Sequence, residues 1–396
     1  MRLVASCRIA VGAAAVVALL VGCTSKPESP RSVGADAAPA STTSSSGQSA
    51  TPPAQPATSS ARPTTPSVNP AAVRPTVAAT VATGLKTPWG LAFLPDGSAL
   101  VSERDTGQIK RIPPGGGVSA IGTVPGVKHG GEGGLLGLAV ASTFAQDRWL
   151  YAYLTADDGN RVVRMKVAGD FRLGAPQPLL TGIPAGPIHN GGRLAFGPDG
   201  LLYVTTGDGS SRSRSQDKQS LAGKILRVTP DGKPAPGNPA GSPVWTYGHR
   251  NVQGVAWDSQ GRMWADEFGQ ETWDELNLIK PGANYGWPIA EGKAGKAGLA
   301  DPVVQWRPSE ASPSGIAIAA GSVWVAALRG ARLWQVPLTA DGVGTPKQWF
   351  VGEFGRLRTV AAAPDGSLWL VTSNTDGRGS PRGGDDRIVR IVLSGG

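Results

Sequence analysis

A pattern repeated six times between residues 89 and 372 limits the folds open to this chain. Each copy has an apolar stretch around a small alanine, then a turn, then a second stretch of alternating polarity. The central alanines lie 44 to 61 residues apart, at Ala92, Ala139, Ala195, Ala256, Ala317 and Ala361. Alternation with a period of two is typical of strands. Units of roughly 40–50 residues that each supply several strands predict an all-β, six-bladed β-propeller.

A propeller blade can bury its faces only against its neighbours, so the ring has to close. Each unit also contains a further strand-like element, such as GKILRV at 223–228 and DRIVRI at 386–391. We expect TVAATVATGL at 76–85 to close the ring by adding an outer strand to the blade that contains residues 386–393. A β-sandwich and an open β-solenoid are the alternatives.

The start of the chain has the features of an export signal. Arg2 and Arg8 precede an apolar run at residues 9–21, which is shorter than the roughly 20 residues of a membrane-spanning helix. The run ends in Leu-Val-Gly-Cys, which resembles a bacterial lipobox. Residues 1–22 are therefore predicted to be a lipoprotein signal peptide and Cys23 the lipidated residue. An ordinary signal peptide with an incidental cysteine is the alternative. The lipid would anchor the protein to the outer face of the cell membrane.

Residues 23–76 have the composition of a disordered linker. They are rich in Ala, Ser, Thr and Pro, and every aromatic residue of the chain lies at Trp89 or later. Such a segment buries too little apolar surface to fold, so the folded domain is predicted to be residues 77–396. Cys7 and Cys23 are the only cysteines, which leaves that domain without a disulfide. The net charge of +9 includes no long Lys/Arg run, which argues against nucleic-acid binding.

The loops at one face of a propeller surround a central depression where a ligand can bind. His189 leads into the third repeat and is a candidate general base, because imidazole titrates near physiological pH. A histidine that only stabilises a turn is the alternative. Other polar residues lie at strand ends of several repeats: Glu132, Asp208, Arg250, Asn251, Arg329, Arg356 and Arg358. Several arginines in such positions indicate an anionic ligand with more than one acid group.

Five segments together resemble the soluble pyrroloquinoline-quinone (PQQ) dependent aldose sugar dehydrogenases, the glucose/sorbosone dehydrogenase family. They are HNGGRLAFGPDGLLYVTTGD (189–208), QSLAGKILRVTPDG (219–232), YGHRNVQGVAW (247–257), DELNLIKPGANYGWP (274–288) and GRLRTVAAAPDG (355–366). The similarity covers nearly the whole of the predicted folded domain. It implies an oxidoreductase that passes hydride from C1 of an aldose to PQQ and gives a lactone, with an external electron acceptor.

The resemblance also implies a role for each candidate residue. His189 matches the base that takes the proton of the C1 hydroxyl, and Asp208 matches the acid that orients it. Arg250 matches an arginine beside the quinone oxygens, and Asn251 its neighbour in the cofactor pocket. Glu132 lies near the substrate, where some members have Gln, and Asp208 also borders the substrate.

Further cofactor and metal contacts follow from the same resemblance. Arg356 and Arg358 match the pair that binds the cofactor carboxylates, and Arg329 and Ser309 match two other cofactor contacts. The family also uses Ca²⁺, held by PQQ and by backbone carbonyls. In this chain those carbonyls would belong to Gly269 and Gln270.

One loop departs from the family pattern. Relatives usually read Glu-His-Gly-Pro and then Asp-Glu-Leu-Asn, whereas this chain reads EFGQETWDELN at 267–277. Phe268 and Gln270 replace His and Pro, and the loss of Pro removes a constraint on the backbone angle φ. The added Trp273 is expected to narrow the substrate entrance.

Two other functions stay open from the sequence. One is a non-catalytic cell-surface propeller that has lost efficient PQQ and calcium binding. The other is a metal-dependent hydrolase of the lactonase kind, which the arginine-rich rim fits poorly. No Cys/His cluster indicates a zinc or haem site, and His249 is expected to be structural. The protein is expected to act as a monomer or homodimer.

Overall fold

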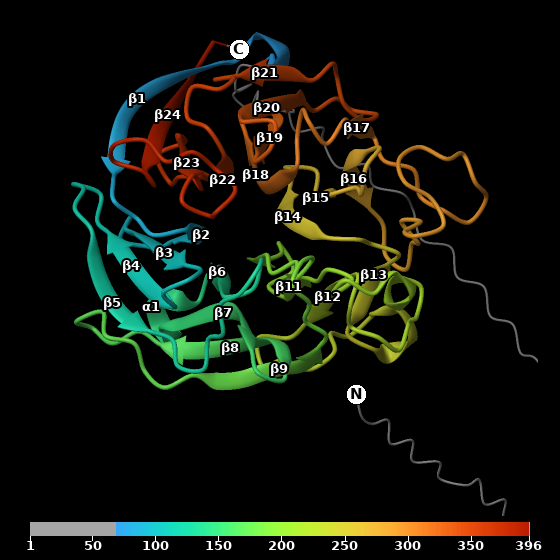
Figure 1. Ribbon diagram of the computed structural model, residues 1–396, viewed down its shortest axis with the longest axis horizontal. Helices are drawn as coiled ribbons and strands as arrows, with labels where there is room; N and C mark the ends of the chain where they lie inside the picture. Colours follow the sequence, from blue (N-terminus) through green and yellow to red (C-terminus); the bar gives the residue numbers. More distant parts are fainter. Residues whose placement is uncertain (1–68, 396) are drawn as a thin grey trace, which may run out of the picture. The chain divides into compact units, whose positions relative to one another are not determined.

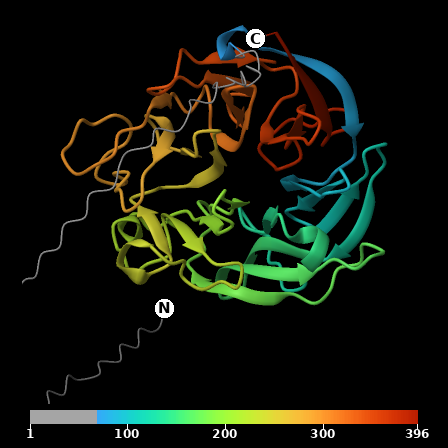
Figure 2. The same cartoon turned by 180° about the vertical axis from the view of Figure 1, so that it is seen from behind.

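The computed structural model describes residues 69–395 of the chain. Within these residues, six antiparallel sheets of four strands each surround a central axis like the blades of a propeller (Figure 1). Figure 2 shows the same ring from behind. The predicted six-bladed, all-β fold is therefore confirmed. The predicted signal peptide, the lipidated Cys23 and the linker up to residue 68 lie outside the described residues.

The blades follow one another along the chain; in the first five the first strand lies nearest the axis, and in the sixth the innermost strand is β22 (Leu357–Ala362) (Figure 1). The first blade consists of β2 (Pro88–Phe93), β3 (Ala99–Glu103), β4 (Gln108–Ile112) and β5 (Ser119–Thr123). The second consists of β6 (Leu135–Val140), β7 (Trp149–Ala156), β8 (Gly159–Lys166) and β9 (Gln177–Ile183). The third consists of β10 (Leu194–Phe196), β11 (Leu202–Thr205), β12 (Lys224–Val228) and β13 (Val244–Tyr247).

The fourth blade consists of β14 (Val252–Trp257), β15 (Met263–Glu267), β16 (Asp274–Ile279) and β17 (Val304–Trp306). The fifth consists of β18 (Pro313–Ala319), β19 (Ser322–Ala327), β20 (Arg332–Pro337) and β21 (Lys347–Trp349). The helices of the described residues are short: α1 (Phe144–Asp147), and the 3-10 helices η1 (Pro70–Ala72), η2 (Arg212–Ser215) and η3 (Pro239–Gly241). No helix in this part of the chain is long and apolar enough to cross a membrane.

The sixth blade joins the two ends of the domain. It consists of β22 (Leu357–Ala362), β23 (Leu368–Thr372), β24 (Ile388–Ser394) and, as its outer strand, β1 (Arg74–Ala82). β1 pairs antiparallel with β24, with Val77 opposite Ile391. The predicted closure of the ring is confirmed, and the outer strand begins a few residues before the predicted start of the domain at residue 77.

The innermost strands come so close together that four of them need a glycine. Each of the six aligned alanines lies on an innermost strand, and two residues before it four blades have Gly90, Gly137, Gly254 and Gly315. A Cβ atom on Gly137 would lie 2.2 Å from the carbonyl oxygen of Gly192, on the next blade. On Gly90 it would lie 2.6 Å from the Leu136 oxygen. The small residues therefore allow backbone to pack on backbone around the axis.

The other two blades have Arg193 and Thr359 at the same position, and these side chains meet across the axis. The Arg193 Nη2 atom donates to Thr359 Oγ1 at 3.1 Å, which links the third blade to the sixth. Arg193 Nε also donates to the backbone oxygen of Gln253 at 2.7 Å, and the guanidinium lies 4.3 Å from the Trp89 ring centroid. We call this buried pair the axial brace.

Apolar side chains fill the space between neighbouring blades. One buried cluster joins Leu100 of the first blade to Leu138 and Leu150 of the second, and another joins Trp324 of the fifth blade to Leu370 of the sixth. Burying a side chain of this size contributes roughly 1.5–3 kcal/mol. Because each blade gains this energy only from its neighbours, the stability of the ring depends on its closure.

Candidate active site

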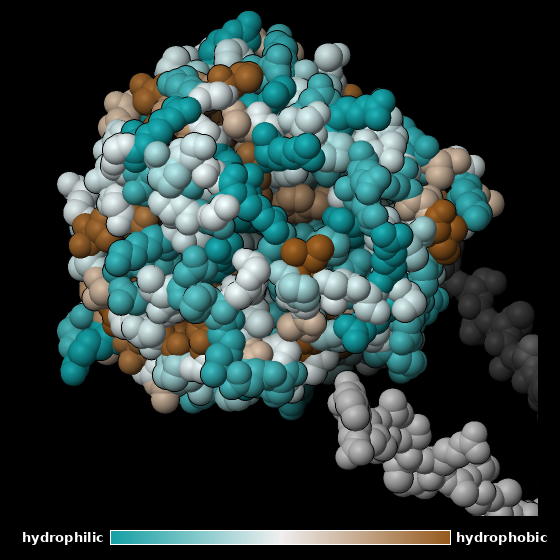
Figure 3. Space-filling view, in the orientation of Figure 1, coloured by the Kyte–Doolittle hydropathy of each residue, from teal (hydrophilic) through white to brown (hydrophobic). Residues whose placement is uncertain are grey.

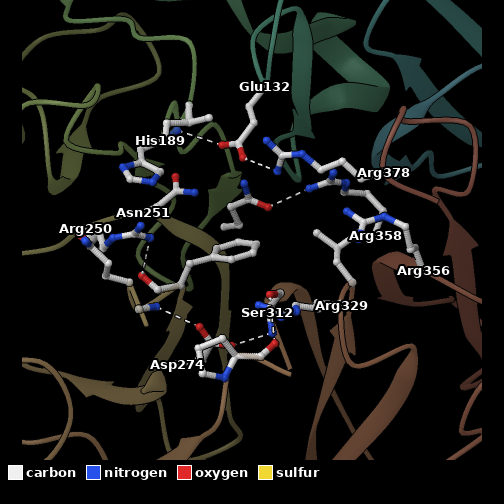
Figure 4. A pocket seen from close by; sticks show the side chains of 17 residues that line it. Glu132, His189, Arg250, Asn251, Asp274, Ser312, Arg329, Arg356, Arg358 and Arg378 are labelled. Atoms are coloured by element: carbon white, nitrogen blue, oxygen red, sulfur yellow. Dashed lines mark hydrogen bonds and ion pairs between the residues drawn. The ribbon is translucent and has the colours of Figure 1, made fainter. Parts of the chain in front are cut away.

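A cavity of about 440 Å³ opens near the axis on one face of the propeller. In the space-filling view the centre of this face is hollowed, and the rim is largely hydrophilic (Figure 3). The lining comes from loops and strand ends of five blades and includes Glu132, His189, Arg250, Asn251, Gly269, Gln270, Arg329, Arg356 and Arg358 (Figure 4). The structure thus brings together nine of the residues singled out in the sequence.

His189 is fixed in an unusual backbone conformation before β10. Its φ is 62°, a left-handed angle that costs a non-glycine residue of the order of 1–3 kcal/mol. Its N–H donates to Glu132 Oε2 at 2.8 Å, and its carbonyl accepts from the Gly209 N–H at 3.1 Å. A Cβ on Gly207 would lie 2.0 Å from the His189 oxygen. Gly207, in the segment TTGD, therefore leaves room for the backbone of the loop that carries His189.

The imidazole of His189 is oriented by a buried carboxylate. Nδ1 lies 2.8 Å from Asp208 Oδ1, and the other oxygen of Asp208 accepts from Trp287 Nε1 at 2.9 Å. Burial raises the pKa of Asp208, but the hydrogen bonds from His189 and Trp287 lower it by more. The pKa of Asp208 therefore lies below its ordinary value. An ionised Asp208 assigns the proton to Nδ1, which leaves Nε2 as an acceptor. Asp208 itself lies behind His189 and borders an adjoining cavity.

Arg250 and Asn251 lie between the third and fourth blades. Asn251 Oδ1 accepts from the Gly191 N–H at 2.9 Å, which holds the histidine loop to the fourth blade. Arg250 Nη1 donates to the Phe268 oxygen at 3.3 Å, and its Nε is buried without a partner in the described residues. Burial lowers the pKa of Arg250, partly offset by nearby acids beginning with Asp208. The guanidinium keeps donor capacity for a ligand in the cavity.

Arg356 and Arg358 share one buried acid. Asp376 Oδ2 lies 2.9 Å from Arg356 Nη2 and 3.6 Å from Arg358 Nη2. Arg358 Nη1 donates to Gln253 Oε1 at 2.9 Å, while its Nε has no partner among the described residues. Burial lowers the pKa of Arg358 to about 9, and Asp376 opposes this shift. Two arginines with one acid leave a positive charge at this wall of the cavity.

Ser309 does not line the cavity as the resemblance implied. A turn closed by the Glu310 N–H and the Arg307 oxygen at 2.8 Å leaves Ser309 exposed. Ser312 lines the cavity instead, together with Pro308. The sequence could not place this serine, because the segment between β17 and β18 has no strand periodicity to fix its register.

Asp274 holds two cavity loops together. Its Oδ1 accepts from the Gly269 N–H at 2.9 Å, and its Oδ2 accepts from the Ser312 N–H at 2.6 Å (Figure 4). Burial raises the pKa of Asp274 to about 7, against these two bonds. Gly269 and Gln270 follow Phe268 along the cavity wall, where the resemblance implied them. Arg329, which follows β19 of the fifth blade, also lines the cavity and is exposed.

Several site residues were not singled out in the sequence, among them Arg378, Asp376 and Trp287. Arg378 lines the cavity and pairs with Glu132 at 2.8 Å, and Asp376 lies two residues before it. Both belong to the loop SNTDGRG after β23, whose position at a strand end was the available signal. Trp287 was part of a quoted motif, but its bond to Asp208 could not be anticipated from spacing.

The other two histidines lie away from the cavity wall. His249 is fully buried, stacks on Tyr285 with ring centroids 4.6 Å apart, and has Nε2 at 2.8 Å from Thr246 Oγ1. Burial lowers its pKa to about 3, in agreement with the expected structural role. His129 is exposed.

The cavity can hold an anionic cofactor, but it lacks a metal cage made of side chains. Among residues 69–395, no group of three or more His, Cys, Asp or Glu residues is arranged to hold a metal ion. Backbone oxygens and oxygens of a bound ligand are donors that suit a hard cation such as Ca²⁺.

Comparisons with known proteins identify the family. The Glucose / Sorbosone dehydrogenase family model matches residues 85–389. Aldose sugar dehydrogenase YliI of Escherichia coli (strain K12) is 32% identical over 335 residues, covering 74% of this chain and 89% of that protein.

Two solved structures extend the likeness to the fold. The PQQ-bound aldose sugar dehydrogenase from Streptomyces coelicolor is 57% identical and has a TM-score of 0.80, covering 81% of this chain and 98% of that chain. The soluble aldose sugar dehydrogenase from Escherichia coli, in the apo form, is 28% identical with a TM-score of 0.70, covering 81% and 99%. Sequence, fold and site agree: the chain belongs to the glucose/sorbosone dehydrogenase family of oxidoreductases.

Proposed function

We propose that this protein is a PQQ-dependent aldose dehydrogenase that transfers hydride from C1 of a sugar to PQQ and releases a lactone. The observation that carries the proposal is the His189–Asp208 pair at 2.8 Å, placed at the wall of an arginine-rich cavity. The PQQ-bound relative from Streptomyces coelicolor, 57% identical, supports the choice of cofactor.

The charges of the cavity suit PQQ, which is a flat quinone with three carboxylates. Arg329, Arg356 and Arg358 line one side, and a carboxylate bound by a guanidinium gains roughly 1.5–3 kcal/mol per charged hydrogen bond. The Nε atoms of Arg250 and Arg358 are buried, have no partner within residues 69–395, and are therefore donors in need of an acceptor. When bound, PQQ supplies the electron sink for the hydride.

His189 would take the proton from the C1 hydroxyl of the sugar through Nε2. Loss of that proton lets the C1–H bond break with its electron pair, and the resulting imidazolium is stabilised by the ionised Asp208 at Nδ1. Trp287 fixes Asp208 from the other side. Glu132 holds the backbone of His189, so that the ring is positioned before the sugar arrives.

Calcium would bind beside the cofactor through the carbonyls of Gly269 and Gln270, whose oxygen atoms suit this cation. The remaining ligands would come from PQQ, because side-chain clusters are absent from the described residues. We also propose that the protein is exported, is lipid-anchored through Cys23, acts as a monomer or homodimer, and passes its electrons to an external acceptor. These proposals rest on the N-terminal sequence and on the family.

The test is turnover by the purified protein with an artificial electron acceptor and a panel of aldoses. Activity that needs both PQQ and Ca²⁺, and that is lost in His189→Gln, would support the proposal. A His189→Gln protein that binds PQQ but keeps wild-type turnover would exclude His189 as the base. A protein that gains no thermal stability from PQQ and Ca²⁺ would favour a non-catalytic binding function.

A further inference from the structure

One carboxylate oxygen binds four consecutive backbone amides in the loop beside the cavity. Glu291 Oε1 accepts from the N–H groups of Gln270 (2.7 Å), Glu271 (3.1 Å), Thr272 (2.9 Å) and Trp273 (3.0 Å). Successive N–H groups that converge on one anion form a nest, in which the negative charge decides the shape of the loop. We call residues 268–273 the nest loop.

The nest determines where the carbonyls of this loop point. A trans peptide is planar, so the C=O of one residue points opposite to the N–H of the next. Because the N–H groups of Gln270 and Glu271 point to Glu291, the carbonyls of Gly269 and Gln270 point away from it. Both residues line the cavity. Glu291 therefore turns two backbone oxygens away from itself at the cavity wall.

The peptide between Phe268 and Gly269 follows the same rule, and its N–H and its C=O each have a hydrogen-bond partner. The Gly269 N–H donates to Asp274 at 2.9 Å, and the Phe268 oxygen, on the other side of that peptide, accepts from Arg250, a residue of the cavity wall. The loop is also tightly closed. A Cβ on Gly269 would lie 1.8 Å from the Trp273 oxygen and 2.7 Å from Glu291 Oε1.

The charge of Glu291 suits this role. Four N–H donors that converge on one oxygen are best matched by a carboxylate, which only accepts hydrogen bonds when it is ionised. The nest loop lies outside the strands and has Gln270 where a proline would restrict φ. These bonds to Glu291 are the restraint that the structure provides in its place.

We propose that Glu291 is a positioning residue for calcium: it holds the nest loop so that the carbonyls of Gly269 and Gln270 face the cation. The inference rests on the proposed function, which supplies the calcium. Glu291 would not touch the metal. It would act through the two residues that do, as the hydrogen-bonded outer shell of a metal site commonly does.

The test compares Glu291→Ala and Glu291→Gln with Glu271→Gln. Glu271 is in the same loop, but its side chain is exposed, so Glu271→Gln removes the same charge and leaves the nest intact. Calcium affinity would be measured by calorimetry on PQQ-loaded protein. We expect Glu291→Ala to weaken calcium binding about 10–100-fold, as outer-shell changes commonly do. Glu291→Gln, which keeps one oxygen, should lose less, and Glu271→Gln should stay close to wild type.

A second measurement needs no cofactor. Hydrogen exchange of metal-free protein should show faster exchange at the amides of residues 270–273 in Glu291→Ala, with exchange in β14 and β15 unchanged, because those strands lie outside the nest. Unchanged exchange and unchanged calcium affinity in Glu291→Ala, while the wild type binds PQQ and calcium, would overturn this inference alone. A wild type that binds neither would overturn the proposed function and the inference with it.

Discussion

Nδ1 of His189 lies 2.8 Å from Oδ1 of Asp208, and Asp208 is almost completely buried between this bond and the indole N–H of Trp287. The carboxylate is fixed on both sides, so the imidazole has one favoured tautomer, with its proton on Nδ1. A buried carboxylate that fixes the tautomer is the arrangement expected of a histidine that acts as a base, and the proposed role of His189 rests on it.

Asp208→Asn is expected to lower kcat by about 10²–10⁴-fold. An asparagine amide can donate to Nδ1, which would move the ring proton to Nε2 and block the base. PQQ affinity should change little, because Asp208 lies behind His189. Single-turnover reduction of bound PQQ by an aldose measures the step directly. Trp287→Phe, which keeps the carboxylate, is the milder comparison, and an Asp208→Asn protein as fast as wild type would contradict the assigned tautomer.

Arg356→Met is expected to weaken PQQ binding by roughly 10–150-fold, the equivalent of about 1.5–3 kcal/mol for a charged hydrogen bond. Asp376 would still be paired with Arg358, so the fold should survive. Equilibrium titration with PQQ gives the affinity. Arg172→Met removes an exposed arginine paired with Asp170, outside the cavity, and serves as the charge control. Equal affinities for both variants would mean that the arginine wall does not bind the cofactor.

Glu132 should matter through its bond to the His189 N–H rather than through its ion pair with Arg378. Arg378 is about half exposed (55%), and exposed ion pairs contribute at most about 1 kcal/mol. Glu132→Gln keeps an oxygen for His189, so we expect kcat within a few-fold of wild type. Glu132→Ala releases the strained backbone, and a displaced base costs of the order of 10²-fold. If kcat falls equally in both variants, the carboxylate charge is what matters.

The buried pair Glu267 and Glu275 should make the stability of the metal-free protein depend on pH. Burial raises the pKa of Glu267 to about 7 and that of Glu275 to about 8, and for Glu275 the neighbouring Glu267 adds to the effect. The native state therefore keeps protons that the unfolded chain releases above about pH 4.5. Stability should fall as the pH rises from 5.5 toward 8, by about 3 kcal/mol for Glu275 alone. Glu267 and Asp274, whose pKa values are raised to about 7, should add to this fall.

Glu275→Gln should flatten this profile. The glutamine amide is neutral at every pH, and Asn277, whose Oδ1 lacks a partner among the described residues, can turn to accept from it. Chemical denaturation at several pH values with a chelator present gives the profile. A variant whose stability still falls as steeply as that of wild type would place the buried charge elsewhere.

The fold was predictable because its signal is repeated. Six alanines at similar spacing marked the innermost strands, and the closing strand could be found because the ring needs a partner for β24. The glycines before Ala92 and Ala139 were visible, but their cause, contact between backbones of neighbouring blades, appears only in three dimensions. His189, Arg250 and Arg358 were found because each lies near the end of a strand.

The rest of the site depends on loops, where no periodicity fixes the register. The resemblance implied Ser309 as a cofactor contact, whereas Ser312 lines the cavity. The turn between β17 and β18 shifts the chain between these two serines. Arg378 lies in a glycine-rich loop whose path the sequence does not state. Glu291 binds backbone amides, and an acid that binds amides looks in the sequence like any surface acid.

The axial brace affects how ligands can reach the cavity. Arg193 and Thr359 join opposite blades beneath Gln253, a residue of the cavity wall. Their bond crosses the axis beside this wall, so a ligand that leaves the brace intact would enter and leave the cavity through the loops at its mouth. The sugar, the lactone and the electron acceptor would then all pass through the same opening of the cavity. On the proposed function, the lactone has to leave before the acceptor can approach, and the two half-reactions must alternate in time because they cannot be separated in space.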